Sequence, residues 1–515
     1  MIHLSSKDDT ISDIKPVEHA LPTEQSRHAN VVLPNGWKYR RPSLPYFASP
    51  QVQLLLVAFI CFLCPGMFNA LNGLGGGGQE LGESSASSDA NSALYSTFAV
   101  VGFFARTITN TLGIRRALGF GGIGYSVYAS AYLCFNHTYI SHPAVARGYM
   151  IFGGFLLGCC AGVLWCAQGQ IMMSYPPEAS KGRYISWFWA IFYLGGVIGS
   201  LVPLAQNFNS NAGKVNDGTY IAFIILMLFG ACLAWTLVDA GEVVRTDGSR
   251  IILMKNPTWK SELLGLWETL FTDPYILCLF PMFFASNWFY VYHFNEVNQA
   301  RFNLHTRALN NTLYWLAQIA GPGIFGFALD FSKLRRPTRA IFAWIALFVL
   351  TFAIWSGGYV FQRTYTRSPH ELMDDDPQFI DFKQGRYIGP MFLYICYGFY
   401  DAAWQTSVYW FMGALTNNGR KLANFAGFYK GIQSAGGGIS WRLDTLKVPY
   451  MSMFLSNWIL LAGSLIVAAP VMLWKIKDTV SLQEDLKFTD ETVDDVVPQH
   501  HISGQNGHEI YQDRV

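Results

Sequence analysis

The sequence predicts an all-α membrane protein in which twelve transmembrane helices form two pseudo-symmetric halves of six. Three observations support this class. Apolar residues make up 51% of the chain and charged residues only 14%, against about 25% charged in a typical soluble domain. Apolar runs of about 20 residues, the length that spans a bilayer core, recur along all 515 residues. Polar features of the first six runs also return, in the same order, in the last six.

The spans follow from the limits of these apolar runs. In the first half we expect spans at 51–74, 90–112, 117–135, 148–173, 184–205 and 220–239. In the second half we expect spans at 274–298, 308–329, 338–361, 387–414, 422–440 and 450–474. The predicted domains are a disordered cytoplasmic tail at 1–49, a half at 50–240, a central cytoplasmic loop at 241–273, a half at 274–474 and a disordered cytoplasmic tail at 475–515. The first tail has no apolar core typical of a signal peptide, so span 51–74 is expected to act as an uncleaved anchor.

Basic residues predict the orientation of the bundle. They gather in alternate short loops, at Arg115 and Arg116, at Lys181 and Arg183, and around Arg335 and Arg336. The positive-inside rule therefore places both termini in the cytoplasm. The sequon at Asn136 then lies outside, where glycosylation is expected. The sequence does not decide between the plasma membrane and an endomembrane.

Several functional classes find no support in the sequence. A net charge of +2 does not indicate nucleic-acid binding. Gly75–Gly78 is not followed by the Lys-Ser/Thr of a nucleotide-binding loop, and no nucleophile–base arrangement stands out, so we expect neither an enzyme nor a cofactor. All nine cysteines lie in apolar runs, so no disulfide framework is expected. Cys61 and Cys64 are interpreted as neighbours on one helix and not as a metal site.

Two polar stretches close corresponding spans of the two halves. Asn69 and Asn72 precede the glycine run, and Asn295 and Asn298 repeat their spacing more than two hundred residues later. Glu296 lies beside the second pair. One interpretation is helix C-capping, for which asparagine and glycine are common. The other is an outer gate or substrate contact in a duplicated architecture, because polar side chains in membrane helices are costly.

Two charges lie deeper, in the middle of their spans. Asp401 and Lys430 each need a partner or a wet cavity at this depth, and their spans belong to the same half. They are either a buried structural ion pair or a proton- or substrate-linked pair whose strength changes with conformation. Gln168 could face a central cavity, and Trp165 and Trp404 are candidates for its aromatic walls.

The internal repeat and one loop motif identify a superfamily. Arg147 stands 18 residues before Trp165, as Arg386 stands 18 before Trp404. Two six-span halves with cytoplasmic ends resemble the major facilitator superfamily. Gly326-x-x-x-Asp330 followed by Arg335 and Arg336 is similar to its cytoplasmic signature, which implies a latch that governs opening. The first-half copy has Asn110, Arg115 and Arg116 at the matching positions, with asparagine in place of aspartate.

The glycine-rich stretch narrows the resemblance. FNALNGLGGGGQ at 68–79, Gly182-Arg183-Tyr184 and the aromatic run 188–192 resemble the Unc-ninety-three-like branch, over about residues 46–475. This resemblance implies a secondary transporter that moves a small solute or ion by alternating access. The alternative that it implies is a non-transporting regulatory or trafficking subunit of an ion channel or membrane receptor. The expected partners are therefore the lipid bilayer, a small solute or ion, or, in the alternative, another membrane protein.

Overall fold

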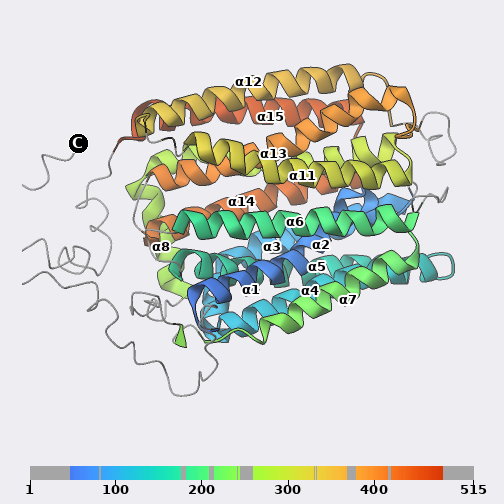
Figure 1. Cartoon of the computed structure of the whole chain (residues 1–515), viewed down its shortest axis with the longest axis horizontal. Coiled ribbons are helices and arrows are strands. Elements are labelled where there is room, and N and C mark those ends of the chain that lie inside the picture. The colour runs from blue at the N-terminus through green and yellow to red at the C-terminus, as the bar shows by residue number, and fades with distance from the viewer. Residues whose placement is uncertain are drawn as a thin grey trace, which may run out of the picture.

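The computed structural model describes residues 47–80, 83–175, 181–207, 214–239, 242–243, 259–329, 331, 333–367, 379–415 and 419–478. In this part of the chain the secondary structure is helical, apart from a single β-bridge between Phe302 and Ile380. The long helices run side by side along the bundle (Figure 1). Eight are long and apolar enough to cross a membrane on length and composition alone.

The first half consists of a broken helix followed by five long ones. Its elements are α1 (Pro50–Leu63), α2 (Pro65–Gly73), α3 (Ser84–Leu112), α4 (Ile114–Thr138), α5 (Pro143–Ser174), α6 (Lys181–Asn207) and α7 (Asp217–Ala234). The predicted span 51–74 is divided between α1 and α2 because Pro65 has no N–H to continue the helical ladder. Cys64, at the break, has non-helical ψ of −83°.

The second half begins with a short helix and another broken span. α8 (Trp259–Thr272) is followed by η6 (Pro274–Leu279), α9 (Phe280–Ala285), α10 (Phe289–Val291) and the π-helix η7 (Tyr292–Gln299). The remaining elements are α11 (Leu304–Leu329), α12 (Arg336–Gln362), η8 (Gly385–Tyr387), α13 (Ile388–Leu415), α14 (Gly419–Thr445), α15 (Tyr450–Pro470) and η9 (Val471–Lys475). The predicted span 274–298 is thus a series of the short segments η6, α9, α10 and η7 and not one regular helix. The π-helix among them is of interest because π-helical turns are rare and often lie at functional sites.

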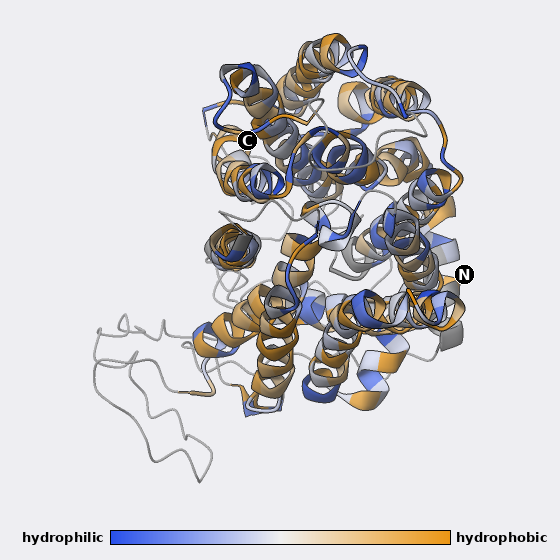
Figure 2. Cartoon of the chain, turned by 90° about the vertical axis from the view of Figure 1, so that its right-hand side faces the viewer, coloured by the Kyte–Doolittle hydropathy of each residue, from blue (hydrophilic) through white to orange (hydrophobic). Residues whose placement is uncertain are grey.

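The two halves gather as two groups of helices and meet along two helix pairs (Figures 1 and 2). α3 packs against α14, and α6 packs against α11. Glycines permit these close approaches. A Cβ at Gly438 would lie 2.8 Å from Ser96 Oγ, and a Cβ at Gly196 would lie 2.9 Å from the Trp315 ring. Ser92 Oγ also donates to the carbonyl of Gly438 over 3.1 Å.

The two ends of the bundle differ. We call the end that carries the glycine loop Gly75–Gln79 and η7 the Gly75 end, and the opposite end the α8 end. α1 starts at the α8 end, where Gln53 accepts a hydrogen bond from the Val238 amide. η9 finishes there too, with Lys475 Nζ 3.5 Å from Asp273 Oδ1. α8 exposes the large apolar side chains of Leu264, Trp267 and Phe271, in agreement with an amphipathic helix. The remainder of the predicted tails lies outside the described residues.

Candidate functional site

The glycine loop closes the Gly75 end of the first half. Gly75 and Gly77 adopt φ of +76° and +62°, which residues with a Cβ rarely adopt. A Cβ at Gly77 would also collide with the ring of Tyr132. Because the loop has no side chains between its backbone and its neighbours, its carbonyls are accessible as acceptors. Tyr220 donates its hydroxyl hydrogen to the Gly77 carbonyl over 2.9 Å.

Arg307 fastens this loop to the second half. Its guanidinium lies 1% exposed at the start of α11. Nε donates to the Leu74 carbonyl over 2.8 Å, and Nη2 donates to the carbonyls of Gly75 over 2.8 Å and Gln79 over 3.3 Å. Hydrogen bonds from a charged donor are stronger than neutral ones. Arg307 therefore seals the first half against the second.

Asn295 and Asn298 also bind across the halves. Asn295 Oδ1 accepts from the Gly76 amide over 2.8 Å, and Asn298 Nδ2 donates to the Gly73 carbonyl over 2.9 Å. Both side chains lie in η7, so the π-helical turn directs them at the glycine loop. These contacts join η7 to α2 and the glycine loop of the other half, and the role of an outer gate stays a prediction.

The first pair of asparagines behaves differently. Asn72 stays within its own half, where its Oδ1 accepts from Asn91 Nδ2 over 3.1 Å and from the Tyr128 hydroxyl over 3.3 Å. Asn69 is half-buried, and its side chain forms no hydrogen bond to any residue that the structure describes. The repeated spacing in the sequence therefore does not give the two pairs equal roles.

A charged group lies beside this seal. Arg367 Nη2 is 3.0 Å from Glu296 Oε1 and 2.6 Å from Asp444 Oδ1. Asp444 also accepts from Ser88 Oγ over 2.6 Å and from Asn295 Nδ2 over 2.9 Å. Burial acts to lower the pKa of Arg367, but the two carboxylates raise it above its usual value, so the guanidinium stays charged. Since Ser88 belongs to α3 and Asp444 to α14, this group joins the halves as well.

Asp401 lies at the centre of the second half with no exposed surface. Its Oδ2 accepts from the Tyr314 hydroxyl over 3.0 Å and from Gln318 Nε2. Its Oδ1 accepts from Gln405 Nε2 over 2.9 Å and from the Tyr290 hydroxyl over 3.4 Å. The donors come from α10, α11 and α13. Neutral donors on three elements therefore supply the hydrogen bonds that this buried carboxylate needs.

Lys430 lies half-buried one helix away, in the middle of α14. Its ammonium donates to Gln433 Oε1 over 3.1 Å. It is also 5.2 Å from the ring centre of Tyr429, 5.4 Å from that of Trp165 and 5.7 Å from that of Tyr409, within range of cation–π attraction. Trp165 belongs to α5, so Lys430 reaches across to the other half.

Two glutamines connect Lys430 with Asp401. Gln433 Nε2 donates to Gln405 Oε1 over 3.2 Å, and Gln405 Nε2 donates to Asp401. Lys430 can only donate and an ionised Asp401 can only accept, so both amides must point the same way. The result is a directional chain of hydrogen bonds. In the described structure, Asp401 and Lys430 are therefore connected through the two amides and do not form a direct ion pair.

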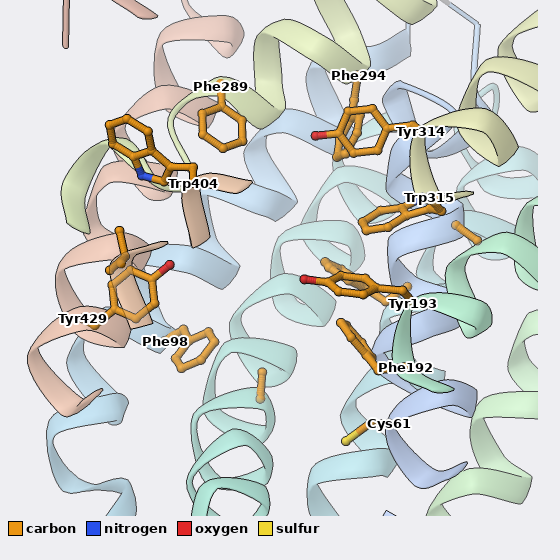
Figure 3. Packing of buried hydrophobic residues seen from close by; sticks show 14 of the residues in the cluster. Cys61, Phe98, Phe192, Tyr193, Phe289, Phe294, Tyr314, Trp315, Trp404 and Tyr429 are labelled. Carbon is orange, nitrogen blue, oxygen red and sulfur yellow. The ribbon is translucent and has the colours of Figure 1, made fainter. Parts of the chain in front are cut away.

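Aromatic rings from both halves lie around this chain. Figure 3 shows Trp315, Tyr193 and Phe192 following one another along the bundle, with Trp404 and Tyr429 on the other side of the view. Tyr193 stacks on Trp315 with ring centres 6.4 Å apart. Trp404 Nε1 donates to Ser286 Oγ over 3.1 Å, so this ring is fixed in packing.

The expected latch is only partly described. Asp330 lies outside the described residues. Arg336 Nη2 donates to the Gly413 carbonyl over 2.6 Å, close to the C-terminus of α13, where a cation complements the helix dipole. Arg335 is exposed. The latch itself stays a prediction.

The first-half counterpart of the latch has an amide contact. Asn110 Oδ1 accepts from Gln170 Nε2 over 3.3 Å, whereas Arg115 and Arg116 are exposed at the start of α4. Gln168 is buried, and its side chain forms no hydrogen bond to the residues that the structure describes. Its predicted role at a cavity stays untested.

The predicted glycosylation site lies on the last turn of α4. Asn136 Nδ2 donates to Asp217 Oδ1 over 3.3 Å, and His137 Nε2 lies 2.8 Å from Asp217 Oδ2. Glycosylation would need this amide nitrogen to be released. The modification remains a prediction.

Sequence reasoning missed several residues of these networks. Arg307, Arg367 and Asp444 stand near span ends, where charges are common and carry little signal. Gln405 and Gln433 could have been found, because they lie four residues after Asp401 and three after Lys430, on the same helical faces.

Known proteins resemble this chain along most of its length. A family model described as ion channel regulatory protein UNC-93 matches residues 84–468. An UNC93-like protein of Schizosaccharomyces pombe is 48% identical over 469 residues, which cover 90% of this chain and 89% of the relative. UNC93-like protein 1 of Arabidopsis thaliana is 43% identical over 415 residues, covering 80% and 87%.

Solved structures show the fold. The xylose transporter XylE from E. coli, in a partially occluded inward-open conformation, matches with a TM-score of 0.55 and 14% identity over 84% of this chain and 97% of that one. The nucleoside transporter NupG matches with a TM-score of 0.50 and 13% identity, covering 82% and 98%. At such identities the likeness concerns the fold alone, and the fold is that of these two transporters. The chain belongs to the UNC-93 family.

Proposed function

We propose that this protein is a secondary transporter that moves a small solute or ion by alternating access. The observation that carries the proposal is the directional hydrogen-bond chain from Lys430 to Asp401. A membrane-embedded charge is costly, and a scaffold has no need to keep two that are not paired with each other. Amides that join a carboxylate to an ammonium can transmit a change of charge from one to the other.

Asp401 is the proposed proton-binding residue. Its four donors belong to three elements, so movement of those elements against one another changes how well the carboxylate is satisfied. When the donors separate, the neutral acid is favoured, and a proton binds. Proton binding and rocking of the helices are then linked, as secondary transport requires.

The orientation and state are part of the same proposal. Arg115, Arg116, Arg335 and Arg336 gather at the α8 end, which the positive-inside rule assigns to the cytoplasm. The Gly75 end then faces outward. Arg307, Asn295 and Asp444 close that end, so the described conformation corresponds to a state sealed on the outside.

The test uses purified full-length protein in liposomes that contain the pH-sensitive dye pyranine. Pentoses, hexoses, nucleosides, amino acids, arene carboxylates and monovalent cations are added one at a time, with and without a pH gradient. At least one solute is expected to move protons in the wild type. Asp401→Asn is expected to abolish the pH dependence of that uptake. Asp217→Asn is the control, because Asp217 is a carboxylate in an exposed pair with His137.

A normal pH dependence in correctly folded Asp401→Asn would remove Asp401 from the coupling. The second candidate function, a regulatory subunit of an ion channel or receptor, is favoured by the description of the family model. It predicts that no solute or pH gradient distinguishes wild type from Lys430→Ala, and that the variant loses a co-purifying membrane protein. That combined result would overturn the transporter proposal.

A further inference from the structure

We propose that Lys430 and the rings around it bind a small organic monoanion with a flat apolar body, such as an arene carboxylate. This proposal rests on the proposed transport function, since it names the class of solute. The site consists of Lys430 and Gln433 on α14, Trp165 on α5 and Tyr409 on α13. It therefore spans the two halves whose relative movement would carry the solute.

The positive charge of Lys430 favours the binding of an anion. Its ammonium forms no salt bridge with any residue that the structure describes, and its hydrogen-bond partner is the neutral Gln433. Asp401 makes no direct contact with it, because the amides of Gln405 and Gln433 lie between the carboxylate and the ammonium. An ammonium at membrane depth without a direct anionic partner is unfavourable, so an anion that reaches it gains both attraction and hydrogen bonds.

The aromatic rings around Lys430 favour a solute whose apolar part is flat. Trp165 stacks on Trp189 with ring centres 6.4 Å apart, and Trp189 lies 6.0 Å from Tyr409. These three rings and Lys430 are all half-buried, so each keeps some accessible surface. Aromatic faces attract planar rings through stacking. A carboxylate at Lys430 would then place its attached ring against this wall.

The same geometry discriminates against other charges. A cationic solute would be attracted to the rings but repelled by the ammonium of Lys430, 5.4 Å from the ring centre of Trp165. A neutral isostere would leave the ammonium without its counter-ion. A dianion would bring a second charge into apolar surroundings, where the described residues supply no second cation beside Lys430. The site therefore favours a single negative charge.

The experiment measures binding of benzoate to the purified full-length protein in nanodiscs, by quenching of tryptophan fluorescence and by thermal shift. Benzamide, benzylammonium and acetate are the neutral, cationic and non-aromatic comparisons. Benzoate is expected to bind most tightly. Lys430→Met should weaken benzoate binding by about tenfold to a hundredfold, as expected for loss of a charged hydrogen-bond partner. Lys430→Arg should keep most of the binding, and Trp165→Leu should weaken it.

Matched controls separate the site from general effects. Lys383→Met removes an exposed lysine that also lies over an aromatic ring, 5.8 Å from Phe382, and should not change benzoate binding. Trp187→Leu removes an exposed tryptophan of the same helix as Trp189 and should not change it either. If Lys430→Met does not fold, Gln433→Glu supplies a second test. This variant places a carboxylate beside Lys430 and should weaken benzoate in the same way.

The outcomes distinguish the two proposals. The anion site would be overturned if benzamide bound as tightly as benzoate or if benzylammonium bound more tightly. Unchanged benzoate binding in Lys430→Met or Gln433→Glu would also overturn it. If benzoate binds as expected but neither benzoate nor any other solute of the screen is taken up into liposomes, the site stands and the transport proposal fails. If another solute is transported with Asp401-dependent coupling while benzoate does not bind, the transport proposal stands and the site fails.

Discussion

Replacing Arg307 by methionine is expected to open the Gly75 end of the bundle. The side chain of Arg307 donates to three carbonyls of the opposite half, two of them over 2.8 Å. A hydrogen bond from a charged donor contributes about 1.5 to 3 kcal/mol. The two short bonds, taken at the lower end of this range, give about 3 kcal/mol in favour of the closed state. Their loss should shift the population toward an open state by roughly a hundredfold.

The assay follows a cysteine placed where the halves part. Ser92 is half-buried on α3, with its hydroxyl bonded to Gly438 of α14. Ser92→Cys should react slowly with a membrane-impermeant maleimide in the otherwise wild-type protein, and much faster once Arg307→Met is added. The native cysteines give a background, which the parent protein without Ser92→Cys measures.

Two further variants control this result. Arg339→Met removes an arginine that donates to the Leu329 carbonyl within its own half, and it should leave the labelling rate unchanged. Arg307→Lys keeps the charge but loses the planar fork, so its effect should be smaller than that of methionine. Unchanged labelling of a correctly folded Arg307→Met protein would refute the assignment of Arg307 as a seal between the halves.

Two more predictions concern stability. Gly77→Ala should lower the melting temperature, because φ of +62° costs a residue with a Cβ about 1 to 2 kcal/mol and the added carbon collides with Tyr132. Gly463→Ala is the control in the same thermal scan and should have little effect, because no atoms lie near its Cβ position. Burial acts to raise the pKa of Asp381, but hydrogen bonds from the Lys383 amide, Asn303 and His305 lower it below its usual value. The folded-state pKa is the lower one, so the stabilisation is present above the unfolded pKa of about 3.9 and is lost as pH falls through the folded value. Asp381→Asn should therefore melt below the wild type at pH 7, and this difference should shrink as the pH is lowered toward 3; a pH-independent difference would contradict the argument.

The sequence predicted the helices better than their breaks. Hydropathy predicts long apolar segments because a bilayer demands them wherever the chain crosses it, and eight helices of the described residues are long and apolar enough to do so. The break at Pro65 carried a local signal, whereas the π-helix at Tyr292–Gln299 did not. Its widened turn places Asn295 and Asn298 against the glycine loop, and contacts with the other half hold it there. Propensity alone does not predict such a turn.

The sequence pointed to two charges of the polar network but not to the residues that connect them. Asp401 and Lys430 were recognisable because single charges at membrane depth are rare and costly. Because they lie on consecutive spans, the sequence favoured a direct pair of Asp401 and Lys430. In the structure Gln405 and Gln433 lie between the two charges. Arg307 and Asp444 could not be singled out, since a charge near the end of a span is usually solvated.

The sequence by itself determined the membrane class, the repeated architecture and the family, because each depends on composition, spacing and motifs that are local in the chain. The tertiary structure alone decided what each polar side chain binds. Gly76 and Asn295 are 219 residues apart in sequence, and Ser88 and Asp444 are 356 apart, yet each pair shares a hydrogen bond. Contacts over such separations depend on how two helical halves pack, and packing is a property of the whole chain and not of any one segment.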